Sequence, residues 1–268
     1  MRNLLSAGQN SVNKMKLLRA EILKLSLTLI ISTMAACTEN RITGPIDPTL
    51  PERVGLAEAE KVKDLEKILD AYNARLGDPV FIRAFKHEEL LEVWVQSVEN
   101  KRFIKVKAYP ICAASGKPGP KLREGDKQVP EGFYHIGVFN PLSSFHLSLG
   151  LNYPNASDRY FSDSEKPGGD IYIHGSCMSI GCLAMTDDSI KEIYVFCDRA
   201  RRNGQKNIPV HIFPFEFGSK NEEEISQRYP GYNKRWKNLK ELDNYFVMTG
   251  KLPKWDVDSS GRYILLPN

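Results

Sequence analysis

Residues 170–185 read Asp-Ile-Tyr-Ile-His-Gly-Ser-Cys-Met-Ser-Ile-Gly-Cys-Leu-Ala-Met, and the predictions for the rest of the chain start from this stretch. Its first part, Ile171–Ile173, is β-branched and aromatic and follows a Pro-Gly-Gly turn signal, which predicts a short buried strand. The strand brings His174 to its end, and Gly175 then allows the backbone to turn. The stretch therefore predicts a histidine presented at the end of a strand.

The cysteine that follows this histidine predicts nucleophilic catalysis. A thiol is a good nucleophile only as the thiolate, and a free cysteine with a pKa of about 8.5 is mostly protonated at neutral pH. An imidazole within hydrogen-bond reach can take that proton, so we predict that His174 activates Cys182 for acyl transfer. Gly181 permits a tight turn, whose N–H groups, with that of Cys182, are expected to face a developing oxyanion. Ser179 is expected to hydrogen-bond within the turn or to orient the imidazole.

A structural interpretation of these residues competes with the catalytic one. A lone cysteine is most often a small buried hydrophobe, and a lone histidine is most often a satisfied core residue. Here a strand-end histidine, two glycines, a serine and a cysteine fall within nine residues, which favours catalysis. A zinc site using His174, Cys177 and Cys182 lacks a second Cys-x-x-Cys or His-x-x-x-His half. We therefore expect neither a metal nor another cofactor.

The run His-Gly-x-x-x-Ser-Ile-Gly-Cys-Leu-Ala-Met resembles the active-site motif of YkuD-type L,D-transpeptidase catalytic domains, and it is most similar to their compact YafK-like subgroup. The resemblance covers about residues 78–250 and implies a mostly β, α+β fold with a sandwich or barrel-like core and peripheral helices. It also implies peptidoglycan stem peptides as substrates. Further matching segments are Tyr109–Cys112, Gly119–Lys121, Pro130–Tyr134, Phe145–Ser148 and Tyr153–Asn155.

Four residues outside the catalytic pair are expected to contact the substrate, namely Tyr134, Gly175, His146 and Lys121. His146 lies in a matching segment and is predicted on a strand, Ser144–Leu149, so it also competes for the role of catalytic histidine. Lys121 belongs to the Gly- and Pro-rich stretch 115–130, which predicts a loop at the rim of the site. The loop's basic residues either hold substrate carboxylates or are simply solvated.

Two departures from the family pattern leave the reaction open. The family motif has a histidine where this chain has Ile180, and an arginine is expected where Leu183 and Ala184 stand. Loss of a guanidinium removes a bidentate partner for a carboxylate. The acyl acceptor is therefore an amine, as in crosslinking or protein attachment, or water, as in a hydrolase that releases wall-attached lipoprotein.

Two further classes of protein are less well supported. A non-catalytic wall-binding module has no need of both Cys182 and His174. In a papain-like protease the cysteine precedes its histidine by a long stretch of chain, which is the reverse of the order here. Nucleic acid is also an unexpected partner, because the net charge of +4 over 268 residues is mild and no basic stripe is interleaved with aromatic residues.

Residues 1–37 are predicted to be a targeting segment. Basic residues precede the apolar run Leu25–Ala36, which is short for a membrane span but suits a signal peptide. The run ends in Met-Ala-Ala-Cys, which resembles a bacterial lipoprotein signal with Cys37 as the lipidated residue. We therefore expect export to the periplasm and a lipid anchor in the outer membrane; an uncleaved anchor and a simple signal cut near Ala36 are the alternatives.

The mature chain is expected to have four parts: a linker over 38–55, a helix over 56–77, the catalytic domain over 78–218 and a helical extension over 219–268. Within the catalytic domain, apolar or alternating runs predict strands, and Thr186 is a natural N-cap for a helix over Ile190–Arg201. The other predicted strands are Val80–Phe85, Leu91–Val98, Phe103–Ala108, Phe133–Phe139 and Pro209–Phe217.

Three cysteines have no role in this scheme, namely Cys112, Cys177 and Cys197. They are an odd number in a compartment that favours disulfides, so one pair can close. We predict a Cys177–Cys197 disulfide, although the spacing of the cysteines does not favour this pair over the others. Alternatively, Cys177 acts as a resolving thiol, because it lies only five residues before Cys182.

Overall fold

The computed structural model describes residue 48 and residues 50–267, all within one compact unit, Ile42–Asn268. The predicted signal segment, including Cys37, and most of the predicted linker lie outside the described residues. Within the part that is described, no helix has the length and apolar character needed to cross a membrane.

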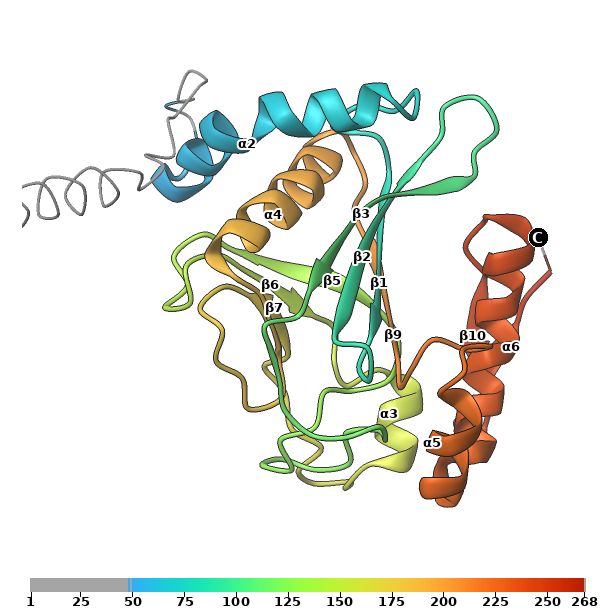
Figure 1. Ribbon diagram of the computed structural model, residues 1–268. Helices are drawn as coiled ribbons and strands as arrows, with labels where there is room; N and C mark the ends of the chain where they lie inside the picture. Colours follow the sequence, from blue (N-terminus) through green and yellow to red (C-terminus); the bar gives the residue numbers. More distant parts are fainter. Residues whose placement is uncertain (1–47, 49, 268) are drawn as a thin grey trace, which may run out of the picture. The chain divides into compact units, whose positions relative to one another are not determined.

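The core is a nine-stranded sheet with the strand order β3-β2-β1-β9-β5-β6-β7-β8-β4 (Figure 1). Neighbouring strands are antiparallel, except for the parallel pairs β1–β9 and β7–β8. The strands are β1 (Val80–Phe85), β2 (Leu90–Gln96), β3 (Phe103–Pro110), β4 (Ala113–Ala114), β5 (Gly132–Asn140), β6 (Ser148–Leu151), β7 (Tyr172–His174), β8 (Leu183–Ala184) and β9 (Ile208–Phe213).

The sheet curls on itself. Its two edge strands, β3 and β4, stand at opposite ends of the strand order, yet only Ile111 and Cys112 separate them in the chain. Two residues span at most about 7 Å, so the two edges must approach one another. The expected barrel-like form of a mostly β core is therefore confirmed.

Both faces of the central strands are buried. Along β1, Ile82 and Ala84 belong to the main core, whereas Phe81 and Phe85 belong to two aromatic clusters on the opposite face. Side chains alternate between the faces of a strand, so a strand buried on both faces reads as an unbroken apolar run. This explains why the run Val80–Phe85 predicted its strand with the correct ends.

Two packed helices, α2 (Glu52–Asp70) and α4 (Asp187–Arg202), cover one face of the sheet (Figure 1). Thr186 caps α4 as predicted, because its Oγ1 accepts the N–H of Ser189 at 3.1 Å. Arg199 of α4 forms two hydrogen bonds, of 2.7 and 2.8 Å, with the buried Glu58 of α2. The N-terminal helix is thus part of the same core.

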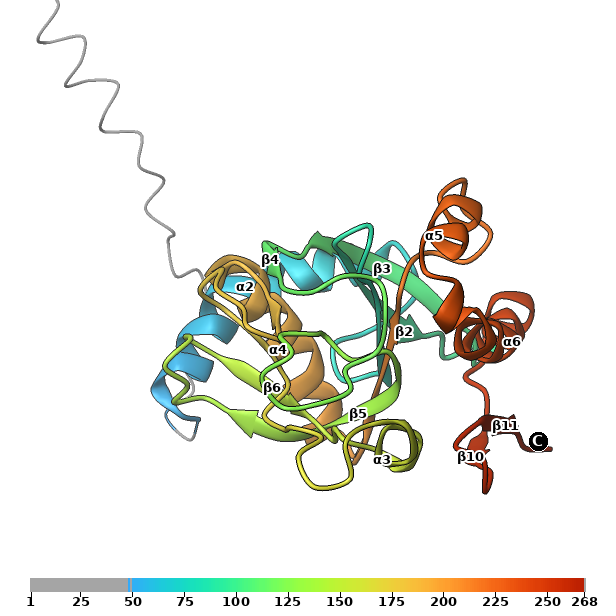
Figure 2. The same cartoon turned by 90° about the horizontal axis from the view of Figure 1, so that it is seen from below.

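The C-terminal extension covers the other face, as seen from below in Figure 2. Trp236 and Leu239 of α6 pack with Phe85 and Phe133 of the sheet. Trp236 also donates from Nε1 to the buried carboxylate of Glu131 at 2.9 Å. The extension comprises α5 (Glu222–Arg228), η1 (Pro230–Tyr232), α6 (Asn233–Thr249) and the hairpin β10 (Trp255–Val257) with β11 (Tyr263–Leu265).

Three predicted elements differ from the structure, and one helix was not predicted. The strand predicted over Pro209–Phe217 ends at Phe213. The N-terminal helix begins at Glu52, inside the predicted linker, and ends at Asp70, before the predicted stop. The predicted strand Ser144–Leu149 is wrong in its first half, since His146 lies in a turn with φ of 69° and β6 begins at Ser148. The short helix α3 (Ala156–Phe161) was not predicted, although its N-cap residue Asn155 forms a capping box with Asp158.

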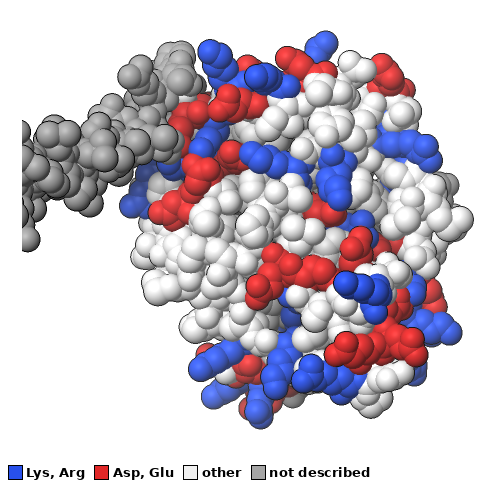
Figure 3. Space-filling model, viewed as in Figure 1, with Lys and Arg blue, Asp and Glu red and all other residues white. Residues whose placement is uncertain are grey.

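On the face seen in Figure 3, lysine and arginine side chains alternate with aspartate and glutamate side chains. This mixed distribution forms no single-sign stripe of the kind that would bind a nucleic acid backbone on that face.

Candidate active site

The pairing of β7 with β8 brings the predicted catalytic residues together. Ile173 lies beside Leu183 in this parallel pair, and both side chains belong to the main core. His174 is the last residue of β7, and Cys182 directly precedes β8. In the register of this pair His174 lies beside Ala184, so Cys182 is two positions away along the neighbouring segment.

The imidazole of His174 is buried and oriented. Its Nδ1 lies 2.6 Å from the carbonyl oxygen of Gly175, which can only accept, so Nδ1 carries the proton and Nε2 is left as a base. The ring of Phe145 lies 4.7 Å from the imidazole, centroid to centroid. Burial lowers the pKa of His174, and the bond to Gly175 opposes that effect. The neutral, base-competent form is therefore favoured.

The thiol of Cys182 is partly exposed and donates to the carbonyl oxygen of Asp170 at 3.5 Å. Burial raises the pKa of the thiol; the N–H of Tyr172 and the charge of Lys121 lower it, and the charge of Asp170 raises it further. The structure records no hydrogen bond between this thiol and His174 among the described residues. Catalytic hydrogen bonds are often loose without substrate and tighten in the complex, so the catalytic role of the pair stays a prediction.

The turn before the thiol differs from the expectation for an oxyanion site. The N–H groups of Gly181 and Cys182 donate to Oγ of Ser179, at 3.2 and 2.9 Å. Ser179 in turn donates to the carbonyl of Cys182 at 2.7 Å. The two N–H groups predicted to face an oxyanion are therefore already bonded, and Ser179 shapes the turn rather than orienting the imidazole. Gly181 has φ of 137°, which favours glycine.

At the start of the loop between β7 and β8, Gly175 lets its backbone lie close to Asp187 and Phe145. A Cβ there would lie 2.5 Å from Oδ1 of Asp187 and 2.9 Å from the carbonyl oxygen of Phe145. Its N–H donates to that carbonyl at 3.1 Å, and the Asp187 carboxylate accepts the N–H of Ser176 at 2.8 Å. Gly175 thus shapes the backbone beneath His174, and the first residue of α4 holds the loop.

A disulfide between Cys112 and Cys177 ties this loop to the β3–β4 junction. The predicted pairing of Cys177 with Cys197 is wrong, because Cys197 is fully buried in α4 and is a free thiol. Cys177 is therefore not available as a resolving thiol while this bond is intact. Only Cys182 and Cys197 are free among the cysteines that are described.

His146 contacts the N-terminal helix α2. Its Nε2 is buried and has no hydrogen-bond partner, and burial lowers its pKa. Its carbonyl accepts from Arg53 of α2 at 2.8 Å. Among the described residues no contact joins His146 to Cys182, as none joins His174 to it, so the choice of His174 as the base rests on the motif and on its position beside β8.

Tyr134 and Lys121, predicted to bind substrate, have different positions. Tyr134 is buried and donates its hydroxyl to Asp158 at 3.1 Å, so its predicted contact with substrate is wrong and its role is structural. Lys121 is also buried, and its ammonium is held by Asp126 at 2.8 Å. Its charge still acts on the thiol of Cys182, which keeps Lys121 at the site as an electrostatic neighbour.

Three residues of the site escaped prediction: Phe145, Asp170 and Asp187. Phe145 lies in a segment that matched the family motif, which was a usable signal. Asp170 contributes a backbone carbonyl at φ of 53°, and Asp187 reaches back across eleven residues to Ser176. Neither contact has a local sequence signature.

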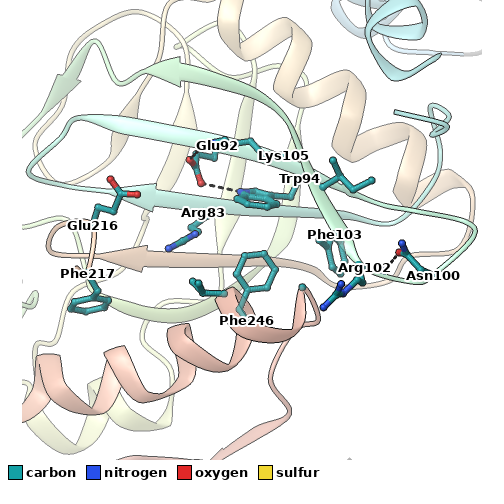
Figure 4. A pocket seen from close by; sticks show the side chains of 13 residues that line it. Arg83, Glu92, Trp94, Asn100, Arg102, Phe103, Lys105, Glu216, Phe217 and Phe246 are labelled. Carbon is teal, nitrogen blue, oxygen red and sulfur yellow. Dashed lines mark hydrogen bonds and ion pairs between the residues drawn. The ribbon is translucent and has the colours of Figure 1, made fainter. Parts of the chain in front are cut away.

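A cavity of about 550 Å³ lies away from this site, between strands β1–β3 and α6 (Figure 4). Arg83, Trp94 and Phe246 point into it, and Glu92, Lys105 and Glu216 give it mixed charge. None of its lining residues belongs to β7, β8 or the loop between them. Within the described ranges, no group of three or more His, Cys, Asp or Glu residues is placed to hold a metal ion.

Comparisons with known proteins identify the family. The sequence profile of the YkuD family, described as the L,D-transpeptidase catalytic domain, matches residues 79–212. A curated relative from Escherichia coli K12, named "Putative L,D-transpeptidase YafK", is 36% identical over 192 residues, which are 71% of this chain and 75% of the relative. The protein of the same name from Escherichia coli O157:H7 matches equally well.

Two solved structures show a distant likeness to this chain. Pgp2 from Campylobacter jejuni, described as a helical cell shape determining protein, aligns with a TM-score of 0.40 and 17% identity, over 72% of this chain and 80% of that chain. Bd1075 from Bdellovibrio bacteriovorus aligns with a TM-score of 0.38 and 22% identity, over 63% and 62% of the two chains. On the profile match and the identity to YafK, this chain belongs to the YkuD family of L,D-transpeptidase catalytic domains.

Proposed function

We propose that this protein is a cysteine-dependent acyltransferase that acts on peptidoglycan stem peptides. The observation that carries the proposal is that Cys182, directly before β8, is two register positions from His174 at the end of the neighbouring β7, while the bond at Nδ1 leaves Nε2 of His174 as a base. Family membership and the likeness to YafK support the substrate class.

The mechanism follows from these two side chains. Nε2 of His174 removes the proton from Sγ of Cys182, and the thiolate attacks the carbonyl carbon of a DAP-linked amide in the stem peptide. The C–N bond breaks as the imidazolium returns its proton to the leaving amine, which leaves a thioester on Cys182. An acceptor then attacks the thioester carbonyl and loses its proton to His174, which frees the thiol.

The acceptor decides between two reactions. An amine acceptor makes the enzyme a transpeptidase, which crosslinks stems or attaches a protein, whereas water makes it a hydrolase that releases wall-attached lipoprotein. The residues of the loop beside the thiol support the hydrolase as the second candidate, because they lack two side chains of the family pattern. Ile180 stands where the family pattern has a histidine and is 80% exposed, and Leu183 and Ala184 supply no guanidinium.

The proposed location is the periplasm, with the chain anchored to the outer membrane through lipid on Cys37. The support is the sequence of residues 25–37, an apolar run that ends in a small-residue pair before a cysteine. A lipid anchor would hold the enzyme next to wall-attached lipoproteins, the partner of the hydrolase reaction.

The test is turnover of wall substrates by the chain from Thr38 onward, with its disulfide intact. DAP-containing muropeptides and lipoprotein-bearing sacculi are incubated with the protein, and mass spectrometry follows the products. New crosslinked or amine-exchanged species identify a transpeptidase, and shortened stems or freed protein identify a hydrolase. We expect Cys182→Ala and His174→Ala to abolish either reaction.

The matched control is Cys197→Ala, which removes the other free thiol from a buried position that no substrate reaches. It should keep full turnover. Full activity in Cys182→Ala would end the proposed mechanism, and sacculus binding without turnover in the wild type would favour a wall-binding module.

A further inference from the structure

A second cavity lies where the catalytic domain meets the C-terminal extension. It has a volume of about 410 Å³ and is formed by the 115–130 loop, α3, the start of α6 and the turn between β10 and β11. Much of its wall therefore comes from chain beyond residue 212, where the match to the family profile ends. The lining residues that give the cavity its apolar and positively charged walls are Leu122, Tyr160, Phe161, Lys234, Arg235 and Arg262.

Aromatic rings form one wall of this cavity. Tyr160 and Phe161 of α3 are 57% and 43% exposed, although they are large and apolar, and their rings pack edge to face at 5.0 Å. Tyr160 also lies against the hairpin turn, where a Cβ on Gly261 would come within 2.5 Å of its ring. This wall is thus rigid before any ligand arrives, which lowers the entropic cost of binding.

The charge of the lining is positive. Lys234, Arg235 and Arg262 line the cavity, and no aspartate or glutamate does. Arg262 reaches Glu241 only at 4.0 Å, and both of these side chains are about half exposed, so solvent screens the pair. Lys234 is exposed and has no recorded partner among the described residues. The walls thus combine an apolar surface with cations.

Arg235 adds a positive charge to the cavity. Its Nη2 donates to Asp158 at 3.1 Å and to the carbonyl of Glu131 at 3.0 Å. Its Nε and Nη1 are buried without a hydrogen-bond partner in the described part of the chain. The ring of Phe161 lies 5.0 Å from the guanidinium carbon. These two nitrogens have almost no accessible surface, so Arg235 contributes its positive charge to the cavity rather than open hydrogen-bond donors.

The 115–130 loop connects this cavity to the catalytic thiol. On one side of the loop, Lys121 packs on Gly168, and the carbonyl oxygen of Gln128 lies 3.4 Å from where a Cβ on Gly181 would be. On the other side, Pro120 and Leu122 line the cavity. One loop therefore separates the cavity from the reacting sulfur.

We propose that this cavity is a substrate subsite for a carboxylate-bearing part of the stem peptide, distant along the peptide from the amide that Cys182 attacks. The cations bind the carboxylate, and the aromatic wall packs against the apolar side of the peptide. The inference rests on the proposed function, because it takes the ligand from the substrate class assigned there. It gives the C-terminal extension a part in substrate recognition beyond covering the sheet.

The test measures binding in the full-length protein, purified in mild detergent with the inert Cys182→Ala change. Isothermal calorimetry compares DAP-containing muropeptides with the same peptides after their carboxylates are converted to carboxamides. We expect the carboxamide form to bind at least about tenfold more weakly, since a hydrogen bond to a charged group is worth more than a neutral one. Lys234→Glu and Arg262→Glu should weaken binding of the carboxylate form to a similar degree.

The matched control is Lys237→Glu, which makes the same charge change three residues further along α6 at an exposed position outside the cavity. Its affinity should equal that of the parent protein. Equal binding of the two peptide forms, an equal loss in Lys237→Glu, or no measurable muropeptide binding would overturn the inference.

Failure of the subsite is distinguishable from failure of the proposed function. If the wild type turns over its substrate but Lys234→Glu and Arg262→Glu bind muropeptides as tightly as the parent protein, the subsite alone is rejected. Charge-dependent binding without any turnover would reject the proposed reaction and keep the cavity as a carboxylate site.

Discussion

The thiol of Cys182 rests in its neutral form. Burial raises its pKa, and burial lowers the pKa of His174, so neither partner is charged at neutral pH. A thiolate–imidazolium pair formed in advance would require the opposite shifts.

This resting state predicts slow alkylation of the free thiol. The rate of reaction of Cys182 with iodoacetamide should rise with pH to a midpoint above the ordinary thiol value of about 8.5. Lys121→Met should raise the midpoint further, because it removes a positive charge that favours the thiolate. Lys117→Met, an exposed change in the same loop, is the control and should have no effect. Mass spectrometry of the labelled peptide gives the rate, and a midpoint near neutrality would contradict the neutral resting pair.

A second residue predicts how stability depends on pH. His211 is buried between the rings of Phe81 and Phe133, and burial, with the charge of Arg83, lowers its pKa to about 3. The unfolded chain takes up this proton near pH 6.5 and the folded chain does not, so stability falls as pH decreases between these values. The loss is at most about 1.4 kcal/mol per pH unit.

The measurement is urea unfolding of the wild type and His211→Phe from pH 7 to pH 4. The difference between the two isolates His211 from other groups, such as Asp243, whose pKa burial raises to about 6. The wild type should lose more stability than the variant as pH falls. If the unfolding free energies of the two proteins fall in parallel with pH, His211 takes up its proton in the folded protein as readily as in the unfolded chain.

At the level of elements, the loop between β7 and β8 depends on distant anchors. It joins two parallel strands with only residues 175–182, whereas parallel neighbours usually need a longer crossover. The disulfide to Cys112 and the bonds from Gly175 and Ser176 hold it in place. The position of this loop therefore depends on the β3–β4 junction and on α4 as well as on β7 and β8.

Removal of the disulfide should affect both stability and turnover. The bond closes a loop of 65 residues, so the double variant Cys112→Ala/Cys177→Ala should lose about 2–4 kcal/mol of unfolding free energy. Turnover should also fall, because the loop between His174 and Cys182 loses its tether. Urea unfolding and product formation measure the two effects, and reduced wild type should match the variant. Unchanged values in both measurements would show that the loop holds its shape without the bond.

At the level of the whole molecule, the extension completes the core. The fully buried Lys86–Glu131 ion pair lies beneath it, and Trp236 donates to the same carboxylate. Leu239 is fully buried in the cluster that joins α6 to β5 and β9. The outer face of the sheet would expose several phenylalanines without this cover, so we infer that extension and catalytic domain fold together.

This shared core predicts one cooperative transition. Leu239→Ala should destabilise the protein by about 2–5 kcal/mol, since it leaves a cavity in the joint cluster. Val247→Ala on the same helix is the control, because Val247 is 62% exposed. Hydrogen exchange should show that amides in α6 and in β9 lose protection together in Leu239→Ala. Early loss of protection in α6 alone would show that the extension unfolds independently.

Local patterns were sufficient for the central strands, whereas the catalytic roles of His174 and Cys182 stay a prediction. The motif places His174 and Cys182 within nine residues, and β1 is an apolar run because both of its faces are buried. The N-cap of α4 was also predictable, because a capping threonine accepts a hydrogen bond from an N–H group only two or three residues further along the chain. Each of these features depends on residues that are close in the chain.

Long-range contacts were not accessible in this way. The disulfide joins residues 65 apart, and the second cavity draws its walls from segments between Pro120 and Tyr263. Tyr134 matched the family motif, yet its hydroxyl is bound to Asp158, 24 residues later, through the curl of the sheet. Periodicity and turn signals report only the neighbourhood of a residue, whereas these partners meet because the sheet curls and the extension packs on its outer face.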